Sequence, residues 1–294
     1  MRYRGLLIKG MTLFLLLAFS VTAGADAVRV ISYGKDLTED QRNKVYKTFG
    51  LTEEEKNQIA VTEVSNDEEK EYLQDLVDEE LIGTKAISSA YVELLGAGEG
   101  IQVETHNINW VTPEIYANAL ATAEVKDARI IAAAPFPVSG TAALTGIFKA
   151  FESATGKSLS KESKDIANEE MVRTGEIAKS INDSGRATEL IIRIKEEVIE
   201  RGLKDADEIR QVIINISNEL KINLTEEQVN QLVNLMKKIN GLNLNMDEIN
   251  SQLKNIRERL DQLIAQGQGI QGIFQRLIDF FARLFAGIRS LFGG

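Results

Sequence analysis

The stretch 128–146, ARIIAAAPFPVSGTAALTG, joins a buried strand to the start of a helix. The apolar run over 128–134 has the length and composition of a strand inside a sheet, and Pro135 is expected to end that strand. The small residues after the prolines then lead into a helix predicted over 141–151. A strand followed by a helix is the unit from which α/β domains are built.

The turn between this strand and this helix carries the candidate ligand-binding residues. In α/β domains, ligands bind where the carboxyl end of a strand meets a helix N-terminus, because free N–H groups there accept anions. The candidates in this chain are Ser139, Gly140 and Thr141. A tight packing turn made of small residues explains the same pattern, so the sequence leaves both interpretations open.

Residues 28–155 alternate short β-rich runs with helical patterns. A glycine-rich segment at 96–100 separates two of the β-rich runs and predicts a hairpin between them. Five strands interleaved with helices predict an N-terminal α/β domain over 28–155. The strands are expected at 28–33, 59–64, 87–95, 101–109 and 128–134, and the helices at 38–49, 65–81, 113–123 and 141–151.

The chain contains no proline after Pro137, and its hydrophobic periodicity from there on is helical. This pattern predicts an all-α helical domain over 156–240. The fold class is therefore α+β overall, with an α/β domain followed by a helical bundle and a coiled-coil-like C-terminal helix. Helices are predicted at 160–182, 186–201, 205–221 and 225–240.

The C-terminal segment carries an apolar seam with a 3-4 spacing, which predicts a coiled-coil-like helix over 241–266. Heptads of this kind also allow an oligomer. The spacing continues over 270–292, after a glycine-containing segment at 266–269 that is predicted to act as a hinge. The seam consists of Met246, Ile249, Leu253, Ile256, Leu260, Leu263, Ile270, Phe274, Leu277, Phe281, Leu284, Ile288 and Leu291.

Over 270–292 the apolar face widens beyond a coiled-coil stripe, and arginines lie on the polar side. A cationic amphipathic helix with an aromatic face suits a membrane surface or an envelope protein partner. The alternative is that this helix folds back onto the helices of 160–240 and completes their core. The residues predicted to bind a membrane or partner are Ile273, Phe274, Arg276, Phe280, Phe281, Arg283, Phe285, Arg289 and Phe292.

Residues 1–25 have the pattern of a signal peptide. Three basic residues precede a short apolar run at 11–21, and small residues at 23–25 supply a cleavage pattern. The apolar run is short for a membrane span, although an uncleaved anchor is the alternative. We therefore expect an exported protein that is extracellular or associated with the cell envelope.

The composition excludes several kinds of chemistry. The chain has no cysteine, which rules out a thiol nucleophile, a cysteine-ligated metal and a lipoprotein attachment site. Its formal net charge is −10, and residues 26–155 contain 23 Asp and Glu against 11 Lys and Arg. A field of that sign repels phosphate backbones, so we expect no nucleic-acid partner.

The sequence predicts no catalytic residue, no metal site and no cofactor. His106 is the lone histidine, and the two Ser-x-x-Lys matches lack the further motifs of serine–lysine hydrolases. The preferred interpretation is a secreted or envelope-associated non-enzymatic protein that binds a membrane surface or envelope partner through its C-terminal helix. The alternative is an envelope hydrolase or small-ligand binder that uses the 135–146 loop.

Three stretches, 33–41, 83–93 and 134–146, together with 111–114, are similar to the YpuA-like secreted proteins of Gram-positive, spore-forming bacteria. They cover most of the predicted α/β domain. The resemblance implies export and an envelope or extracellular location. It implies no catalytic residues, because this family has no established activity.

Overall fold

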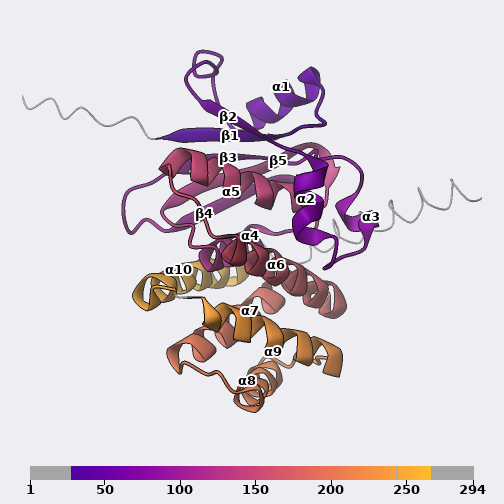
Figure 1. Cartoon of the computed structure of the whole chain (residues 1–294), viewed down its shortest axis with the longest axis vertical. Helices are drawn as coiled ribbons and strands as arrows, with labels where there is room; N and C mark the ends of the chain where they lie inside the picture. The colour runs from indigo at the N-terminus through magenta and orange to yellow at the C-terminus, as the bar shows by residue number, and fades with distance from the viewer. Residues whose placement is uncertain (1–27, 243, 266–294) are drawn as a thin grey trace, which may run out of the picture.

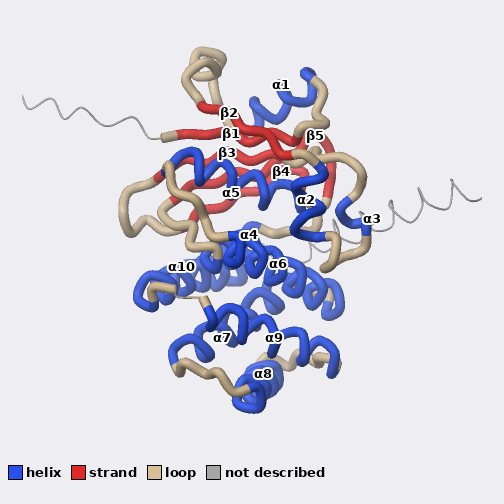
Figure 2. Tube along the Cα trace, viewed as in Figure 1, coloured by secondary structure: helices blue, strands red, loops and turns tan. Residues whose placement is uncertain are grey.

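The computed structural model describes residues 28–242 and 244–265 (Figure 1). One five-stranded sheet and its helices occupy one half of the described chain, and the later helices occupy the other half (Figure 2). The predicted α+β class, with about five strands in the N-terminal region, is therefore confirmed. None of the helices that the structure describes is long and apolar enough to cross a membrane.

The sheet is mixed, with the strand order β2-β1-β3-β5-β4. The β1–β2 and β4–β5 pairs are parallel, whereas β3 is antiparallel to both of its neighbours. The strands are β1 (Arg29–Gly34), β2 (Ala60–Val64), β3 (Ser89–Leu94), β4 (Ile101–Ile108) and β5 (Ala128–Val138).

The predicted hairpin between the third and fourth strands is wrong, because β5 lies between them. Ile131 of β5 is in register with Tyr91 of β3 on one side and Glu104 of β4 on the other. The β5 strand is apolar on both faces, so it gains the most burial inside the sheet. The Asp127 carboxylate, just before β5, accepts hydrogen bonds from two N–H groups of the 96–100 segment and holds that connection across the inserted strand.

The β5 strand continues through Pro135 and Pro137, so its predicted end at Pro135 is also wrong. Pairing with β3 stops at Ala133, and β4 forms a bulge at Asn107, whose φ is 57°. The Asn107 side-chain amide donates to the carbonyl of Ala134 at 2.8 Å. The prolines therefore occupy a part of β5 where the regular ladder is interrupted and their missing N–H groups cost little.

Five helices accompany the sheet. Buried side chains of α1 pack on one sheet face together with Ile31 and Ile131, while α5 crosses the opposite face over β1 and β3. The acidic helix predicted at 65–81 is instead two helices, α2 and α3, separated by a turn. The helices are α1 (Glu39–Thr48), α2 (Asn66–Leu73), α3 (Glu79–Ile82), α4 (Pro113–Thr122) and α5 (Thr141–Thr155).

The helices of the second half follow the sequence closely. Each of the four predicted over 160–240 is present with ends within two residues of the prediction. In the structure, side-chain caps define the helix starts, since Ser160, Asp183, Asp205 and Thr225 each accept a backbone N–H there. The helices are α6 (Lys161–Ile181), α7 (Ser184–Glu200), α8 (Ala206–Glu219), α9 (Glu226–Gly241) and α10 (Met246–Ala265).

The α10 helix uses the first half of the apolar seam inside the protein. Ile249, Leu253, Ile256 and Leu260 are buried, and α10 lies against α4 and α7. One cluster of buried apolar side chains extends from Val30 in β1 to Ile256 in α10. The sheet and the later helices therefore share a continuous core. An oligomer formed through the heptads stays a prediction, and the seam beyond residue 265 lies outside the described residues.

A buried ion pair joins three helices within this core. Glu170 of α6 and Lys195 of α7 are both fully buried, with carboxylate and ammonium 2.8 Å apart. Asn118 and Thr122 of α4 donate hydrogen bonds to the same carboxylate. Burial lowers the pKa of Lys195, against the opposing effect of Glu170. Such a pair stabilises one arrangement of the helices because either charge left alone in the core is costly.

Candidate functional site

The predicted ligand-binding residues Ser139, Gly140 and Thr141 lie together in a cleft of about 370 Å³. The turn between β5 and α5 forms one wall, α3 with the loop after it forms another, and the β1–α1 loop closes the third side. The structure thus brings these three residues to a concave surface. Whether they bind a ligand stays a prediction.

The cleft has a polar floor and an exposed rim. Its buried polar side chains are Glu69, Ser88, Ser139 and Thr141. The rim includes the exposed residues Thr84 and Lys85 and the ring of Phe136, which is 44% exposed. Buried polar groups beneath an accessible rim are the arrangement by which binding pockets orient a ligand.

Gly140 fixes the shape of this turn. Its φ is 99°, and a Cβ there would lie 2.4 Å from Ile108 Cγ2 and 2.5 Å from the Tyr116 hydroxyl. The Tyr116 hydroxyl donates to the Gly140 carbonyl. The α5 helix begins with no side-chain cap, so its first N–H groups keep their partial positive charge toward the turn.

Two hydroxyl groups link the turn to α3. The oxygens of Ser139 and Thr141 lie 3.0 Å apart, and the Ser139 hydroxyl donates to the carbonyl of Leu81 at 3.2 Å. The same two residues therefore face both the α5 N-terminus and the α3 backbone. Their side chains have acceptor capacity beyond these contacts, because each hydroxyl oxygen carries two lone pairs.

Glu69 supplies the group in this cleft that the sequence did not reveal. It is 1% exposed, and its Oε2 accepts a long hydrogen bond of 3.3 Å from the Asn66 amide. Its Oε1 has no hydrogen-bond partner. Leaving such a buried acceptor unsatisfied costs about 1–3 kcal/mol, and a donor placed next to Oε1 would remove this cost.

Burial raises the pKa of Glu69 to about 7, despite the opposing effects of the Thr141 hydroxyl, the Asn66 amide and the Lys70 ammonium. A carboxyl that changes charge near neutral pH inside a cleft is typical of functional sites. In the sequence, Glu69 belongs to an acidic stretch that is typical of a solvated helix face. One signal of its burial was available: it precedes the apolar Leu73 by four residues, so both side chains lie on the same face of the helix.

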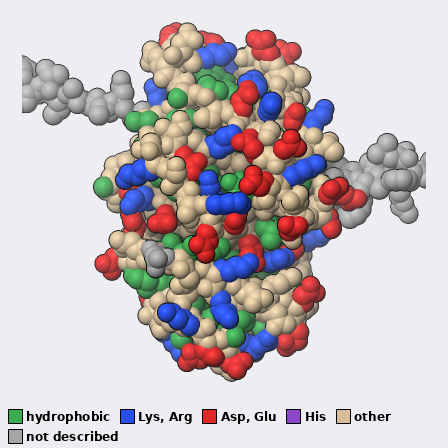
Figure 3. Space-filling view, in the orientation of Figure 1, with side chains coloured by type: hydrophobic (Ala, Val, Ile, Leu, Met, Phe, Trp, Pro, Cys, Tyr) green, Lys and Arg blue, Asp and Glu red, His purple; other side chains and the backbone are tan. Residues whose placement is uncertain are grey.

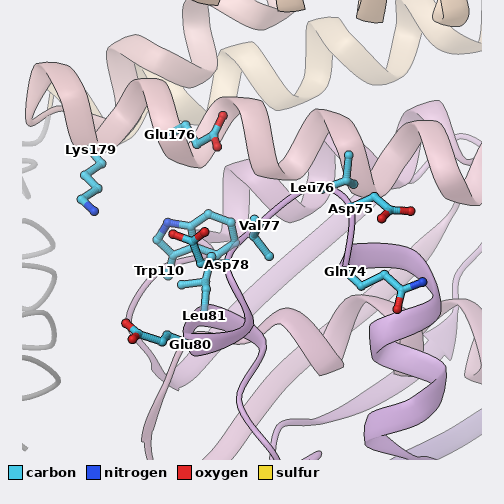
Figure 4. Close-up of a pocket in the computed structure, with 10 residues that line it drawn as sticks. All are labelled: Gln74, Asp75, Leu76, Val77, Asp78, Glu80, Leu81, Trp110, Glu176 and Lys179. Carbon is cyan, nitrogen blue, oxygen red and sulfur yellow. The ribbon is translucent and has the colours of Figure 1, made fainter. Parts of the chain in front are cut away.

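A second cleft, of about 460 Å³, is lined by residues of the segment 74–81, Trp110 and two residues of α6 (Figure 4). Glu176 and Lys179 extend into this region from α6, opposite Asp78 and Glu80 of the α2–α3 segment, with Trp110 among them. Glu80 and Leu81 line both clefts. None of the described side chains that line the second cleft contains a buried polar atom without a partner, so we favour the first cleft.

Other sequence features take no part in the first cleft. His106 is exposed on the edge strand β4 and does not line it. Among residues 28–242 and 244–265, no group of three or more His, Asp or Glu side chains is arranged to hold a metal ion. On the face shown in Figure 3, acidic and basic side chains are interspersed.

The predicted signal peptide and the predicted membrane- or partner-binding residues lie outside the described residues. The latter are Ile273, Phe274, Arg276, Phe280, Phe281, Arg283, Phe285, Arg289 and Phe292.

The comparison with protein families identifies the chain. Residues 33–256, which include the whole first cleft, match the family described as protein of unknown function (DUF1002). The chain belongs to this family. It is also 36% identical over 289 residues to the uncharacterized protein YpuA of Bacillus subtilis (strain 168), with 98% of each chain covered. The resemblance inferred from the sequence is confirmed. No solved structure matches the chain.

The constraint on Gly140 can be measured by comparing two alanine substitutions. Gly140→Ala is expected to lower the free energy of unfolding by about 2–5 kcal/mol, because it combines a left-handed backbone with overpacking. Gly156→Ala is the matched control, since its φ is 67° but a Cβ there would meet no atom within 4 Å. It should lose only about 1 kcal/mol. Equal losses in urea unfolding would contradict the steric role of Ile108 and Tyr116.

The raised pKa of Glu69 predicts a pH-dependent effect of Glu69→Gln. The wild-type carboxyl has an unfolded pKa near 4.5 and a folded pKa of about 7, so its stabilising contribution is lost as pH rises through that interval. Relative to the variant, wild type should lose up to about 3 kcal/mol of unfolding free energy between pH 4.5 and pH 7.5.

Urea unfolding at several pH values measures this difference. Glu71→Gln provides the control, because Glu71 is exposed on the same helix. It removes an exposed carboxylate from α2 and shows how much of the effect comes from a change of surface charge alone. A Glu69→Gln difference that does not change with pH would show that Glu69 does not change its charge near neutral pH.

Proposed function

We propose that this protein is an exported, envelope-associated binding protein that takes a small ligand in the first cleft and catalyses no reaction. The observation that carries the proposal is the buried Oε1 of Glu69, a cleft acceptor to which no hydrogen bond is made in the described structure. A ligand that supplies a donor would remove the cost of leaving that oxygen unsatisfied. The cleft volume of about 370 Å³ lies within the range of small-molecule sites.

A hydrolase that uses Ser139 is less well supported than a binding protein. The Ser139 hydroxyl donates to the Leu81 carbonyl and contacts the Thr141 hydroxyl, and neither group can act as a general base. The exposed His106 lies on β4 and does not line the cleft. The contacts of Ser139 therefore favour a positioning role.

The proposed location rests on residues 1–25, where a basic segment, a short apolar run and a small-residue cleavage pattern favour export. A chain of net charge −10 with no cysteine is compatible with an exported protein that needs no disulfide.

Docking onto an anionic membrane surface through 270–292 is a second proposed function. It is supported by the Phe-rich apolar face and by the three arginines Arg276, Arg283 and Arg289. The α10 helix lies against α4 and α7, and its apolar side chains are buried from Ile249 as far as Leu260. A following amphipathic helix would tether the cleft close to the envelope.

Ligand capture tests the first function. The protein lacking residues 1–25 is incubated with a small-molecule extract of an envelope fraction, washed and denatured, and the released compounds are quantified by mass spectrometry. Thr84→Trp should abolish enrichment, because a large ring on the exposed rim fills the cleft without entering the core. Asn218→Trp, at an exposed position on α8, should capture as wild type does. No enrichment by wild type, or equal enrichment by Thr84→Trp, would contradict ligand binding here.

Vesicle co-sedimentation tests the second function. The same protein should pellet with vesicles containing anionic lipid, and much less with neutral vesicles, because the arginines contribute electrostatic attraction. Phe274→Ser combined with Phe281→Ser should reduce pelleting with anionic vesicles at least tenfold by removing apolar side chains from the docking face. Negligible pelleting of wild type would exclude docking on a lipid surface.

A further inference from the structure

The first cleft is acidic. Asp36, Glu69 and Glu80 line it, against the single cation Lys85. Asp36 and Glu80 are exposed, and Asp36 Oδ2 accepts from the N–H of Ala86 at 2.8 Å. The buried carboxyl group of the cleft is that of Glu69. An anionic ligand would meet an excess of carboxyl groups, so the lining charge favours a cation. The partial positive charge of the uncapped α5 N-terminus, about half an elementary charge, opposes a cation, but three carboxyl groups against one ammonium outweigh it.

The floor is also short of hydrogen-bond donors. The hydroxyls of Ser139 and Thr141 together carry two hydrogens. Those hydrogens face the Leu81 carbonyl, the Glu69 carboxyl and the contact between the two hydroxyl oxygens. When Glu69 is ionised, at least one of these contacts lacks a hydrogen. A ligand that brings several donors and a positive charge satisfies both deficits.

We infer that the first cleft binds the ammonium group of a small organic amine, held by the Glu69 carboxylate and the hydroxyl oxygens of Ser139 and Thr141. This inference rests on the proposed ligand-binding function and names its ligand class. An ammonium group has three donors, which match these three acceptors. Its carbon chain would lie toward the rim, where Phe136, Pro137 and Val138 offer apolar surface.

The acceptor set suits an ammonium group better than other donors. A hard metal ion takes six or more oxygens at short distance, and one carboxylate with two hydroxyls falls short of that number. A neutral alcohol would give Glu69 a donor but would not compensate its charge.

The charges around Glu69 set the pH dependence of binding. Lys70 lies on its own helix, and Tyr116 of α4 interacts with its charge. The remaining neighbours are Lys149 of α5, which pairs with Glu68, Lys161 of α6, which lies near Glu71, and Glu80 and Lys85 at the cleft. Burial raises the pKa of Glu69 to about 7, so its carboxyl is expected to titrate between pH 6 and pH 8.

The test uses n-butylammonium chloride as the probe and n-butanol as its neutral counterpart. Binding is followed by backbone amide NMR shifts of Thr141 and Ala142 in the protein lacking residues 1–25. The amine should bind at least tenfold more tightly than the alcohol at pH 8. Because its binding requires ionised Glu69, its affinity should be about tenfold higher at pH 8 than at pH 6.

Two variants separate the role of Glu69 from general surface charge. Glu69→Gln keeps the size and one carbonyl acceptor, and it should weaken amine binding at least tenfold and abolish the pH dependence. Glu71→Gln, which removes an exposed charge from the same helix, should bind the amine as wild type does. Thermal unfolding confirms that both variants are folded. If Glu69→Gln does not fold, the inference is tested on wild type alone. Amine binding that does not strengthen between pH 6 and pH 8, or captured compounds that the amine does not displace, would contradict it.

The extract experiment distinguishes a wrong ligand class from a wrong site. Enriched compounds that carry a protonated amine and are displaced by n-butylammonium support the inference. Compounds that are captured by wild type but not by Thr84→Trp, and that n-butylammonium does not displace, would contradict the ammonium ligand class but support ligand binding in the first cleft. If wild type enriches no compound and the amine produces no NMR shift, both the ligand class and the ligand-binding function are contradicted.

Discussion

The close approach of Ile108 and Tyr116 to Gly140 fixes the point at which β5 turns into α5. A side chain at this position is excluded by these contacts and by the positive φ, so the chain turns at one glycine and α5 starts without a side-chain cap. This turn sets the hydroxyls of Ser139 and Thr141 beside α2 and α3. The turn forms one wall of the first cleft, and Tyr116 of α4 fixes that wall through its contact with Gly140.

The continuous core holds the turn at Gly140 in place. Tyr116 belongs to α4, which packs on β4 and also on α6, α7 and α10. The buried Glu170–Lys195 pair and its hydrogen bonds to α4 restrict how these helices can shift. The later helices therefore do more than extend the chain, because they support the helix that shapes the cleft.

Local signals explain what the sequence predicted well. The hydrophobic periodicity of the second half lies within each helix, so its helices are predicted to within two residues. The position of β5 between β3 and β4 depends on pairing between distant segments, which hydrophobic periodicity does not encode. The predicted end of β5 at Pro135 is wrong for a related reason. The strand tolerates its prolines because a bulge in β4, a different segment of the chain, interrupts the ladder beside them.

The candidate site likewise contains residues that local patterns predict and one residue that depends on contacts between distant segments. Ser139, Gly140 and Thr141 were predicted because a strand, a small-residue turn and a helix follow one another in the chain. Glu69 was not, because its burial depends on where α2 lies against α5 and α3. In a run of acidic residues, neither composition nor spacing distinguishes the one carboxyl that faces inward from those that face water. Burial, which raises its pKa to about 7, distinguishes this acid from its neighbours.

The charge state of Glu69 can be observed directly by carboxyl ¹³C NMR titration of the protein with selectively labelled glutamate, assigned by comparison with Glu69→Gln. The wild-type signal should titrate near pH 7, and saturation with n-butylammonium should shift its midpoint at least one unit lower by stabilising the carboxylate. A midpoint near the ordinary value of 4.5, unchanged by the amine, would contradict the role assigned to Glu69 and to the cleft that it lines.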